Sequence, residues 1–457
     1  MTYSGRYNLD DTIAAVATPI GSGGIGIVRL SGARSLPILR RVFSIRSDLA
    51  PRTLTYGHIL DPESGQVVDE ALAVYMPAPH TYTRQDVIEI NCHGGPAPLS
   101  RVLDLCLAQG ARLAGPGEFT LRAFLNGRID LVQAEAVADI VEARTEASLR
   151  MAMAQLGGDL SHRIRKARSL VLEVLAWVEA SIDFDQDEIP PCPVEDELIA
   201  AGQVLRDLIA GADRGIVYRQ GIRAAIVGRP NVGKSSLLNA LLRMERAIVT
   251  PIPGTTRDTL EETLNLDGIP LVLVDTAGIR NDTRNLAEDL GVARSRAALA
   301  QADLALLVIE GSSPLTAPDL EIAALIGGKP AILAINKTDL SMVAEVNGIL
   351  PGAPRVEISA LTGAGIADLE QAIQGAVFAG RVVASDVALV SNPRHRDVLR
   401  RAHGHVGSAL AAHRAGVPDD LVSIDLTAAA NALGEITGET VSDTLLETIF
   451  GRFCVGK

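Results

Sequence analysis

Aromatic side chains are scarce in this sequence. Phe, Tyr and Trp together make up 3% of the 457 residues, and Trp occurs once. Hydrophobic residues nevertheless reach 47%, so any core must be built mainly from Ala, Leu, Val and Ile. That content is enough for folded cores, and the length predicts about three domains.

Cysteines are also few, and long hydrophobic runs are missing. The four cysteines, Cys92, Cys106, Cys192 and Cys454, form no Cys-x-x-Cys pair, and a disulfide framework is not expected at this density. No apolar run approaches the roughly 20 residues of a membrane-spanning helix. The first residues, "MTYSGRYNLDDTI", lack the apolar core of a signal peptide. We therefore expect a reduced, soluble, cytoplasmic protein with no membrane segment.

Basic residues are outnumbered by acidic ones. Lys and Arg total 42 against 55 Asp and Glu, which gives a net charge of −13 and a pI of about 5.2. This balance argues against a protein that coats nucleic acid without specificity, although it leaves room for a local basic patch.

The first part of the chain alternates short β-rich runs with Gly and Pro turns. The stretches "GIGIVRL" and "DVIEINCHGG" have strand character, and "PAPLSRVLDLCLAQG" is typical of a helix between Pro and Gly. We expect a compact α+β domain over residues 1–124.

Two helical segments flank a region of alternating strands and helices. Residues 125–218 and 381–457 are rich in residues with helical spacing, and their compositions resemble each other. Between them, strand candidates "IRAAIVG", "PLVLVDTAG", "DLALLVIE", "PAILAINKTD" and "RVEISA" alternate with helices, a pattern typical of a mostly parallel sheet. The sequence thus predicts a discontinuous helical domain into which an α/β domain, residues 219–380, is inserted.

The inserted domain begins with a phosphate-binding motif. "GRPNVGKSS" contains Gly228-x-x-x-x-Gly233-Lys234-Ser235 after a strand and before a helix, which is the P-loop pattern in its proper context. Its glycines allow backbone amides to hold phosphate oxygens, and the helix N-terminus adds favourable partial charge. We expect Lys234 to reach the β- and γ-phosphates and the Ser235 hydroxyl to bind Mg²⁺.

Four further motifs follow in the order of a GTPase. "PGTTRD" places Thr256 as a switch threonine, and "DTAG" ends a strand with Asp275 placed to hold Mg²⁺ through water and the Gly278 amide facing the γ-phosphate. "NKTD", residues 336–339, follows another strand, and the Asp339 carboxylate can accept hydrogen bonds from guanine N1 and its exocyclic amine, which selects GTP over ATP. "SAL", residues 359–361, resembles the last guanine-loop element. The set predicts a Ras-like P-loop G domain.

A catalytic glutamine after Gly278 is missing, because Ile279 occupies that position. Water activation must come from another group, and the nearby candidates in the sequence are Arg280, Asp282, Glu288 and Asp289. No arginine finger can be assigned, so a cation or a partner subunit must offset the charge that develops on the phosphate.

Two weaker patterns do not support a site. "GSGGIG" matches the dinucleotide-binding GxGxxG, but a strand-like run follows it where a helix is required. Cys92 and His93 are adjacent potential metal ligands without a partner cluster, so packing beside a Gly-Gly turn is the favoured interpretation.

Stretches outside the G motifs carry a more specific resemblance. "DTIAAVATPIGSGGIGIVRLSG", "GPGEFTLRAFLNGRIDLVQAEAVADI", "AIVTPIPGTTRD", "ITGE" and the terminal "CVGK", together with the P-loop, resemble the MnmE (TrmE) family of tRNA modification GTPases, within the TrmE-Era-EngA-YihA-Septin-like superfamily. The resemblance spans essentially the whole chain.

The resemblance implies fold, activity and partners. It implies an N-terminal folate-binding domain that also forms a homodimer, a split helical domain and an inserted G domain. Together with the FAD-dependent partner MnmG, the family adds an aminomethyl or carboxymethylaminomethyl group to C5 of the wobble uridine of certain tRNAs, with a one-carbon unit from a tetrahydrofolate. Potassium activates GTP hydrolysis by joining the two G domains across the dimer.

The resemblance also implies site residues. It assigns K⁺ to Asn231, Thr250, Ile252 and Thr255, Mg²⁺ to Ser235, Thr256 and Asp275, and water polarisation to Glu288. It assigns folate to Arg29, Glu89, Arg122 and Lys457, and a thiol needed for modification but not for hydrolysis to Cys454. The complete GTP set is Asn231, Val232, Gly233, Lys234, Ser235, Ser236, Thr250, Thr255, Thr256, Asp275, Thr276, Ala277, Gly278, Asn336, Lys337, Asp339, Ser359 and Ala360.

Two other classes of GTPase share some of these sequence features. A ribosome-assembly or regulatory switch GTPase shares the G motifs, but such proteins usually add an RNA-binding module or a second G domain, and neither is evident here. A membrane-anchored signalling GTPase would depend on Cys454 alone. The C-terminal "CVGK" is a poor prenylation box, because Gly456 is not aliphatic and Lys457 is an unfavourable last residue.

Overall fold

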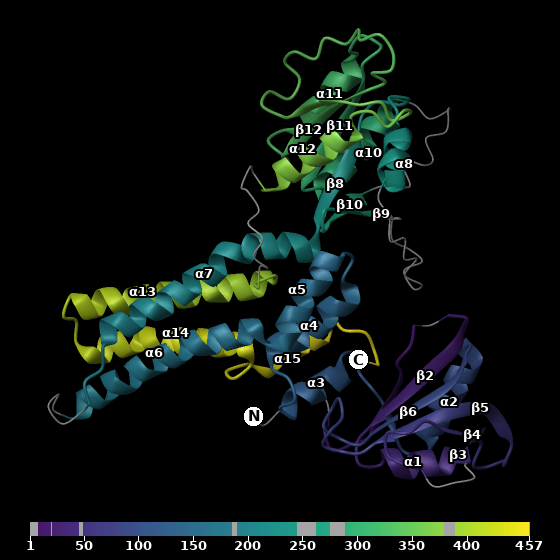
Figure 1. The fold of residues 1–457 in the computed structure, drawn as a ribbon, viewed down its shortest axis with the longest axis vertical. Coiled ribbons are helices and arrows are strands. Elements are labelled where there is room, and N and C mark those ends of the chain that lie inside the picture. Colours follow the sequence, from purple (N-terminus) through teal and green to yellow (C-terminus); the bar gives the residue numbers. More distant parts are fainter. Residues whose placement is uncertain are drawn as a thin grey trace.

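The computed structural model describes residues 8–19, 21–44, 49–184, 190–244, 262–274, 288–378 and 389–456. Figure 1 shows three parts: an N-terminal sheet, a bundle of long helices, and an α/β unit joined to one end of the bundle. The expected multidomain fold is confirmed, whereas the individual domain boundaries stay predictions.

The N-terminal part is a seven-stranded sheet in the order β3-β4-β5-β6-β2-β1-β7. The β1–β7 pair is parallel and the other pairs are antiparallel. Helices α1 and α2 pack against it over a core of aliphatic side chains that alternate along the strands. The bounds are β1 Ile13–Val16, β2 Gly23–Ser31, α1 Ser35–Val42, β3 Phe43–Ser44, β4 Thr55–Leu60, β5 Val67–Met76, β6 Val87–Gly94, α2 Pro96–Ala108 and β7 Arg112–Leu113.

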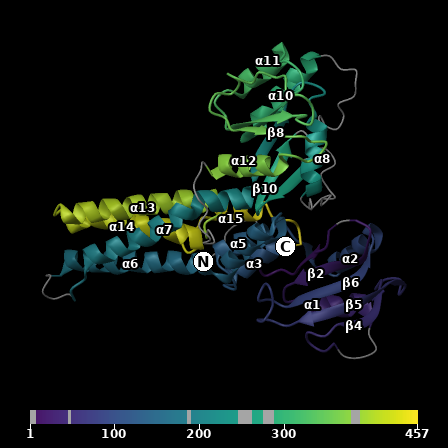
Figure 2. The ribbon, with the colours of Figure 1, turned by 45° about the horizontal axis from the view of Figure 1, so that its top comes forward.

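The helical part is assembled from both flanks of the α/β unit. Helices α6, α7, α13 and α14 lie side by side in both ribbon views (Figures 1 and 2), and they share one core that includes the fully buried Val174, Leu205, Leu399 and Leu426. The predicted discontinuous helical domain is therefore confirmed. The bounds are α3 Glu118–Leu125, α4 Leu131–Glu142, α5 Glu146–Gly157, α6 Asp159–Asp183, α7 Val194–Gln220, α13 Pro393–Arg414, α14 Asp419–Thr437 and α15 Asp443–Phe450.

The α/β unit is a six-stranded sheet in the order β13-β12-β11-β8-β10-β9. All neighbours are parallel except β9, an antiparallel edge strand that the sequence analysis did not identify. Helices α8 and α12 cover one face and α10 and α11 the other, each pair with its own aliphatic core. The bounds are β8 Ile222–Val227, α8 Lys234–Met244, β9 Glu262–Leu266, β10 Ile269–Val274, α10 Glu288–Gln301, β11 Leu304–Glu310, α11 Ala317–Ile326, β12 Ala331–Asn336, β13 Arg355–Glu357 and α12 Ile366–Phe378.

A membrane-spanning helix needs about 20 predominantly apolar residues. Among the helices in the described ranges, none is both long and apolar enough to span a membrane.

Candidate functional site

The P-loop connects β8 to α8 at the carboxyl edge of the parallel strands. Gly228 has φ 155°, and a Cβ there would lie 2.3 Å from the carbonyl oxygen of Val308, so the turn requires glycine. Asn231 also has a positive φ, 66°. Helix α8 begins at Lys234, directly after the loop, and the N-terminus of a helix is favourable for an anion. The Lys234 ammonium lies over the loop and donates to the carbonyl oxygens of Gly228 and Arg229 at 3.0 and 2.9 Å.

The guanine-loop residues gather beside the P-loop. The side-chain amide of Asn336 donates to the carbonyl oxygen of Val232 at 2.7 Å, and its oxygen accepts from the Ala360 amide at 3.0 Å. The Ser359 hydroxyl donates to Asp339 Oδ1 at 2.6 Å. Asn336 therefore connects the P-loop to the segment that carries Ser359 and Ala360, and Ser359 holds the Asp339 carboxylate by a hydrogen bond.

Some residues of the predicted GTP site lie on helices α8 and α10, and others lie outside the described residues. Ser235 and Ser236 lie in the first turn of α8, next to Lys234. Glu288 is the first residue of α10, although its side chain is outside the described part. The other metal and switch residues also lie outside the described residues: Thr250, Ile252, Thr255, Thr256, Asp275, Thr276, Ala277 and Gly278.

A second cluster lies on the N-terminal sheet. Arg29 on β2 is directly opposite Glu89 on β6, and their side chains form an ion pair at 2.7 Å with about a quarter of each exposed. The Arg29 guanidinium also lies 5.8 Å from the centre of the Phe119 ring. The structure thus brings together two of the predicted folate residues, with charged groups of both signs still accessible to a ligand.

The C-terminal tail reaches this cluster. Val455 forms an isolated antiparallel bridge with Pro116, and the Gly117 amide donates to the Cys454 carbonyl oxygen at 3.3 Å. Arg29 donates to the Gly456 carbonyl oxygen at 3.4 Å. The Cys454 side chain is exposed, and the predicted ligand Lys457 lies outside the described residues.

Two residues near Arg29 were missed in the sequence. The Arg128 guanidinium lies 4.8 Å from the centre of the Tyr82 ring and donates to the Tyr82 carbonyl oxygen at 3.3 Å. Burial raises the pKa of Tyr82, and the positive charges of Arg128 and Arg29 partly oppose that shift. No spacing in the sequence connects these side chains, since they come from segments that only the fold brings together.

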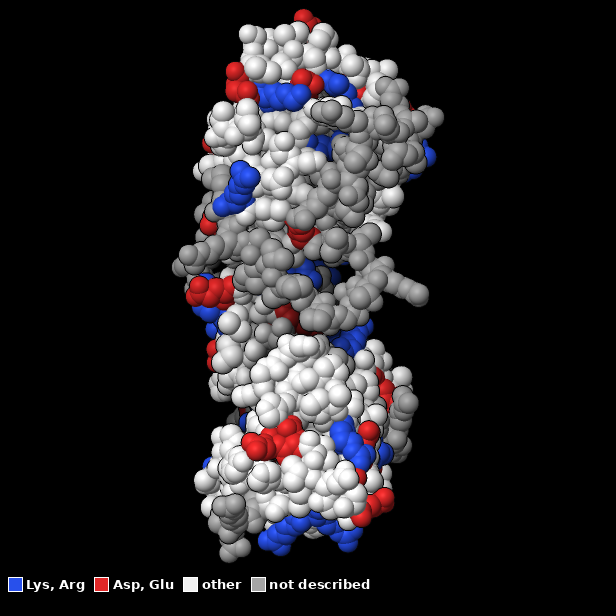
Figure 3. Space-filling model, turned by 90° about the vertical axis from the view of Figure 1, so that its right-hand side faces the viewer, with Lys and Arg blue, Asp and Glu red and all other residues white. Residues whose placement is uncertain are grey.

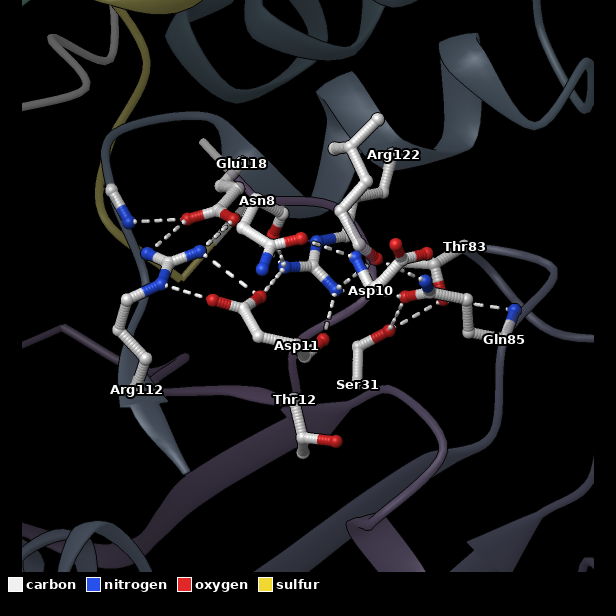
Figure 4. Close-up of polar contacts among 12 residues, drawn as sticks. Asn8, Asp10, Asp11, Thr12, Ser31, Thr83, Gln85, Arg112, Glu118 and Arg122 are labelled. Atoms are coloured by element: carbon white, nitrogen blue, oxygen red, sulfur yellow. Dashed lines mark hydrogen bonds and ion pairs between the residues drawn. The ribbon is translucent and has the colours of Figure 1, made fainter. Parts of the chain in front are cut away.

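Arg122 takes part in a different set of contacts, shown in Figure 4. Its guanidinium is completely buried and pairs with Asp11 at 2.5 Å and with the equally buried Glu118 at 2.9 Å. Arg112 bonds to the same two carboxylates. Burial raises the pKa of Asp11, but the hydrogen bonds from Arg112 and Arg122 outweigh it and hold that pKa below its usual value. The described polar contacts of Arg122 thus belong to this network rather than to the Arg29–Glu89 pair.

The adjacent residues Cys92 and His93 have separate surroundings in the structure. The Cys92 thiol is buried and faces the Gly26 carbonyl oxygen at 3.6 Å, and burial raises its pKa to about 11. The His93 ring pairs with Asp69 on the surface. In the ranges that the structure describes, no three His, Cys, Asp or Glu side chains are grouped to hold a metal ion.

Charged side chains are distributed without a large area of one sign on the face seen in Figure 3. Basic and acidic groups there form small clusters of both signs. Among the described residues on this face, basic side chains do not join into one extended patch (Figure 3).

Comparison with known proteins gives similarity over nearly the whole chain. A family model described as GTP-binding protein TrmE N-terminus matches residues 12–128, and one described as MnmE helical domain matches residues 131–454. The tRNA modification GTPase MnmE of Roseiflexus castenholzii is 54% identical, over 98% of this chain and 99% of its own. That of Chloroflexus aurantiacus is 53% identical, over 98% and 100%. Among solved structures, the G domain of the T. maritima FeoB iron transporter matches 34% of this chain and 98% of its own length, with 26% identity and a TM-score of 0.26.

Proposed function

This chain belongs to the MnmE family of tRNA modification GTPases, and from that premise we propose that it hydrolyses GTP in the modification of C5 of the wobble uridine of certain tRNAs. The proposal depends on one observation: the Asn336 side chain connects the P-loop and the guanine loop. It forms a hydrogen bond with Val232 on one side and with Ala360 on the other. The loop that binds phosphates is thereby held at a fixed distance from the Asp339 carboxylate, which recognises guanine.

In this site the chain's own residues bind and orient GTP. Asp339 accepts hydrogen bonds from the guanine edge, the first amides of α8 hold phosphate oxygens, and Lys234 places its charge near the γ-phosphate. The donor sets implied for metals fit hard cations: hydroxyl and carboxylate oxygens of Ser235, Thr256 and Asp275 for Mg²⁺, and oxygens of Asn231, Thr250, Ile252 and Thr255 for K⁺. When bound, the two cations neutralise phosphate charge. Glu288 is proposed to orient the attacking water.

The first test is GTP hydrolysis by the full chain in K⁺ and in Na⁺ at equal ionic strength. We expect much faster hydrolysis in K⁺, because no arginine is assigned to offset the developing phosphate charge. Equal rates in the two salts would contradict the potassium site.

A second test separates modification from a regulatory role. Nucleoside mass spectrometry of tRNA from a deletion strain should show loss of the modified wobble uridine. Unchanged uridines would favour a ribosome-assembly or regulatory switch GTPase instead.

The proposal includes a tetrahydrofolate site on the N-terminal sheet. Arg29 and the tail residue Lys457 supply positive charge for a folate glutamate, and Glu89 offers an acceptor for the donor edge of a pterin. The placement of the tail carbonyl within hydrogen-bonding distance of Arg29 supports this arrangement. Arg122, which the family resemblance also implies, would act at a distance by holding the segment around α3. Isothermal calorimetry with 5-formyltetrahydrofolate should detect binding, and the absence of heat and of displacement would contradict the site.

The partners follow from the same family membership. We propose a homodimer through the N-terminal domains, association with the FAD-dependent MnmG into a heterotetramer, tRNA as substrate, and a cytoplasmic location. Light scattering of the purified chain, alone and with MnmG, tests both assemblies.

A further inference from the structure

One carboxylate lies between the two loops of the GTP site. Glu310, the last residue of β11, accepts from the Lys337 ammonium through Oε1 at 2.8 Å and from the Arg229 guanidinium through Oε2 at 3.0 Å. Arg229 follows the first glycine of the P-loop, and Lys337 lies in the guanine loop. Each oxygen of Glu310 is thus bound to a cation from a different loop.

The surroundings fix this carboxylate and its partners. The Ser312 hydroxyl donates to Glu310 Oε1 at 3.0 Å, and Arg229 donates to Ser313 at 2.8 Å. Arg229 Nε also lies 3.3 Å from the nearly buried carboxylate of Asp319. The hydrogen bond from Lys337 is the main reason that the pKa of Glu310 is lowered. Glu310 therefore stays ionised at neutral pH.

Lys337 itself is held in an unfavourable backbone conformation. Its φ is 65°, in the left-handed region, which is unfavourable for a residue other than glycine. Such conformations persist where neighbouring structure fixes them, and they often occur at ligand sites. A guanine held by Asp339, two residues further along the same loop, would lie beside the Lys337 side chain.

We propose that Glu310 is a positioning residue of the GTP site, which holds the Lys337 ammonium beside the bound base and sets the spacing between the guanine loop and the P-loop. The inference rests on the proposed GTP function. Without the negative charge, Arg229 and Lys337 would be two cations facing each other across the gap that Glu310 now fills, and their repulsion would separate the loops.

The test is E310Q in the full-length chain, measured with fluorescent methylanthraniloyl derivatives of GDP and IDP. We expect both nucleotides to bind about tenfold more weakly, the size of effect that loss of a charge-assisted hydrogen bond produces. The ratio of GDP to IDP affinity should stay unchanged, because IDP lacks only the exocyclic amine that Asp339 reads, and Asp339 keeps its bond to Ser359. KM for GTP should rise while kcat stays near the wild-type value.

A matched control removes a carboxylate charge elsewhere. Glu195 near the start of α7 pairs with Arg414 at the end of α13. The other end of α7 leads into the α/β unit (Figure 1). E195Q should bind both nucleotides as the wild type does. An E310Q protein that binds within twofold of wild type, or that loses the GDP preference, would overturn the proposal.

A double-mutant cycle shows whether Glu310 acts through Lys337. K337M alone should weaken binding, and adding E310Q to K337M should add little, because the ammonium to be positioned is already gone. Fully additive losses would overturn the mechanism. If E310Q did not fold, the nucleotide affinity of K337M would still decide. Unchanged affinity in K337M would overturn the proposal. Weaker binding by K337M, together with a smaller reduction in affinity in E310D, would support it. If the wild-type chain bound no guanine nucleotide, the proposed function itself would fail.

Discussion

At the residue scale, Arg122 shows how a charged side chain can be part of a core. Its guanidinium and the Glu118 carboxylate are both inaccessible to solvent, and Asp11 completes the pairing. Buried ion pairs gain little over well-packed apolar residues, yet removal of one partner leaves an uncompensated buried charge. The network connects the segment before β1 with α3, so Arg122 is better explained by stability than by direct ligand contact.

R122M should lower the stability of the N-terminal part by up to about 3–5 kcal/mol, because the buried Glu118 and Asp11 would lose one guanidinium and keep only Arg112 as their described arginine partner. Scanning calorimetry of the full chain would show this as a lower unfolding temperature for one transition. The control is R84M, because Arg84 is exposed and its side chain makes a single described hydrogen bond, to the Asn126 carbonyl oxygen. If R122M kept the wild-type transitions and lost only folate affinity, Arg122 would be a ligand residue instead.

Asp139 on α4 gives the fold a pH dependence. Burial raises its pKa to about 6, although Arg219 pairs with it at 2.7 Å and works in the opposite direction. Between about pH 4 and pH 6 the unfolded chain releases this proton while the folded chain retains it. Rising pH therefore favours unfolding in that window, by up to about 3 kcal/mol in total.

D139N removes this titration, so the difference in unfolding temperature between wild type and D139N should change between pH 4 and pH 6. Below pH 4 the unfolding temperature of the wild type should be highest relative to that of D139N. Above pH 6 this advantage of the wild type should be completely lost. Calorimetric scans at half-unit pH intervals measure it. Parallel pH profiles of the two proteins would show that the Arg219 pair keeps Asp139 ionised.

At the element scale, the corner between α4 and α5 connects the helical bundle to the α/β unit. The Thr145 side chain caps α5 by accepting from the Ser148 amide at 3.1 Å, and its hydroxyl donates to the Gly268 carbonyl oxygen at 2.8 Å. Gly268 lies in the β9–β10 turn, and Arg144 bonds to Thr263 of β9 at 3.0 Å. One short corner therefore supports both the start of a helix and a hairpin of the other domain.

T145A should destabilise this corner by about 1 kcal/mol through the lost cap, and it also removes the bond to Gly268. Hydrogen exchange measured by mass spectrometry should become faster in peptides that cover residues 262–274. T145S retains the hydroxyl and should exchange as the wild type does. Faster exchange confined to α5 would show that the hairpin does not depend on this contact.

The elements differ in how far the sequence predicts them. The sequence predicts strands β2, β6, β8 and β10–β13 and helix α2, because each of these elements carries its own hydrophobic pattern. Strand β9 was missed, although Asp267-Gly268 is a turn pair with φ of 47° and 90° that favours a hairpin. The Arg29–Glu89 pair depends on the register of strands 60 residues apart, and the Arg122–Asp11 pair spans 111 residues. Side-chain clusters of this kind follow from tertiary packing, which no local pattern contains.

At the scale of the whole molecule, the C-terminal tail returns to the N-terminal sheet. The helical bundle is interrupted by the α/β unit, and the segment after α15 returns to the N-terminal sheet (Figure 1). Gly456 has φ 97°, and a Cβ there would lie 2.3 Å from the Val16 carbonyl oxygen. The tail can therefore pack against β1 only with glycine at this position.

G456A should release the tail from the N-terminal sheet, because alanine meets both the left-handed backbone, at about 1–2 kcal/mol, and the Val16 carbonyl. We expect folate affinity to fall about tenfold or more, while GTP hydrolysis in K⁺ stays at the wild-type rate, since the P-loop lies in the α/β unit and not in the N-terminal sheet that the tail contacts (Figure 2). C454S is the matched variant: the backbone oxygen of residue 454 still accepts from Gly117, so folate binding and GTP hydrolysis should both persist while tRNA modification is lost. Calorimetry, a phosphate-release assay and nucleoside mass spectrometry measure the three readouts. Wild-type folate affinity in G456A would show that the tail is not part of the folate site. Loss of GTP hydrolysis in C454S would show that the tail is a structural element of the whole molecule, because a thiol that serves only modification cannot alter the distant P-loop.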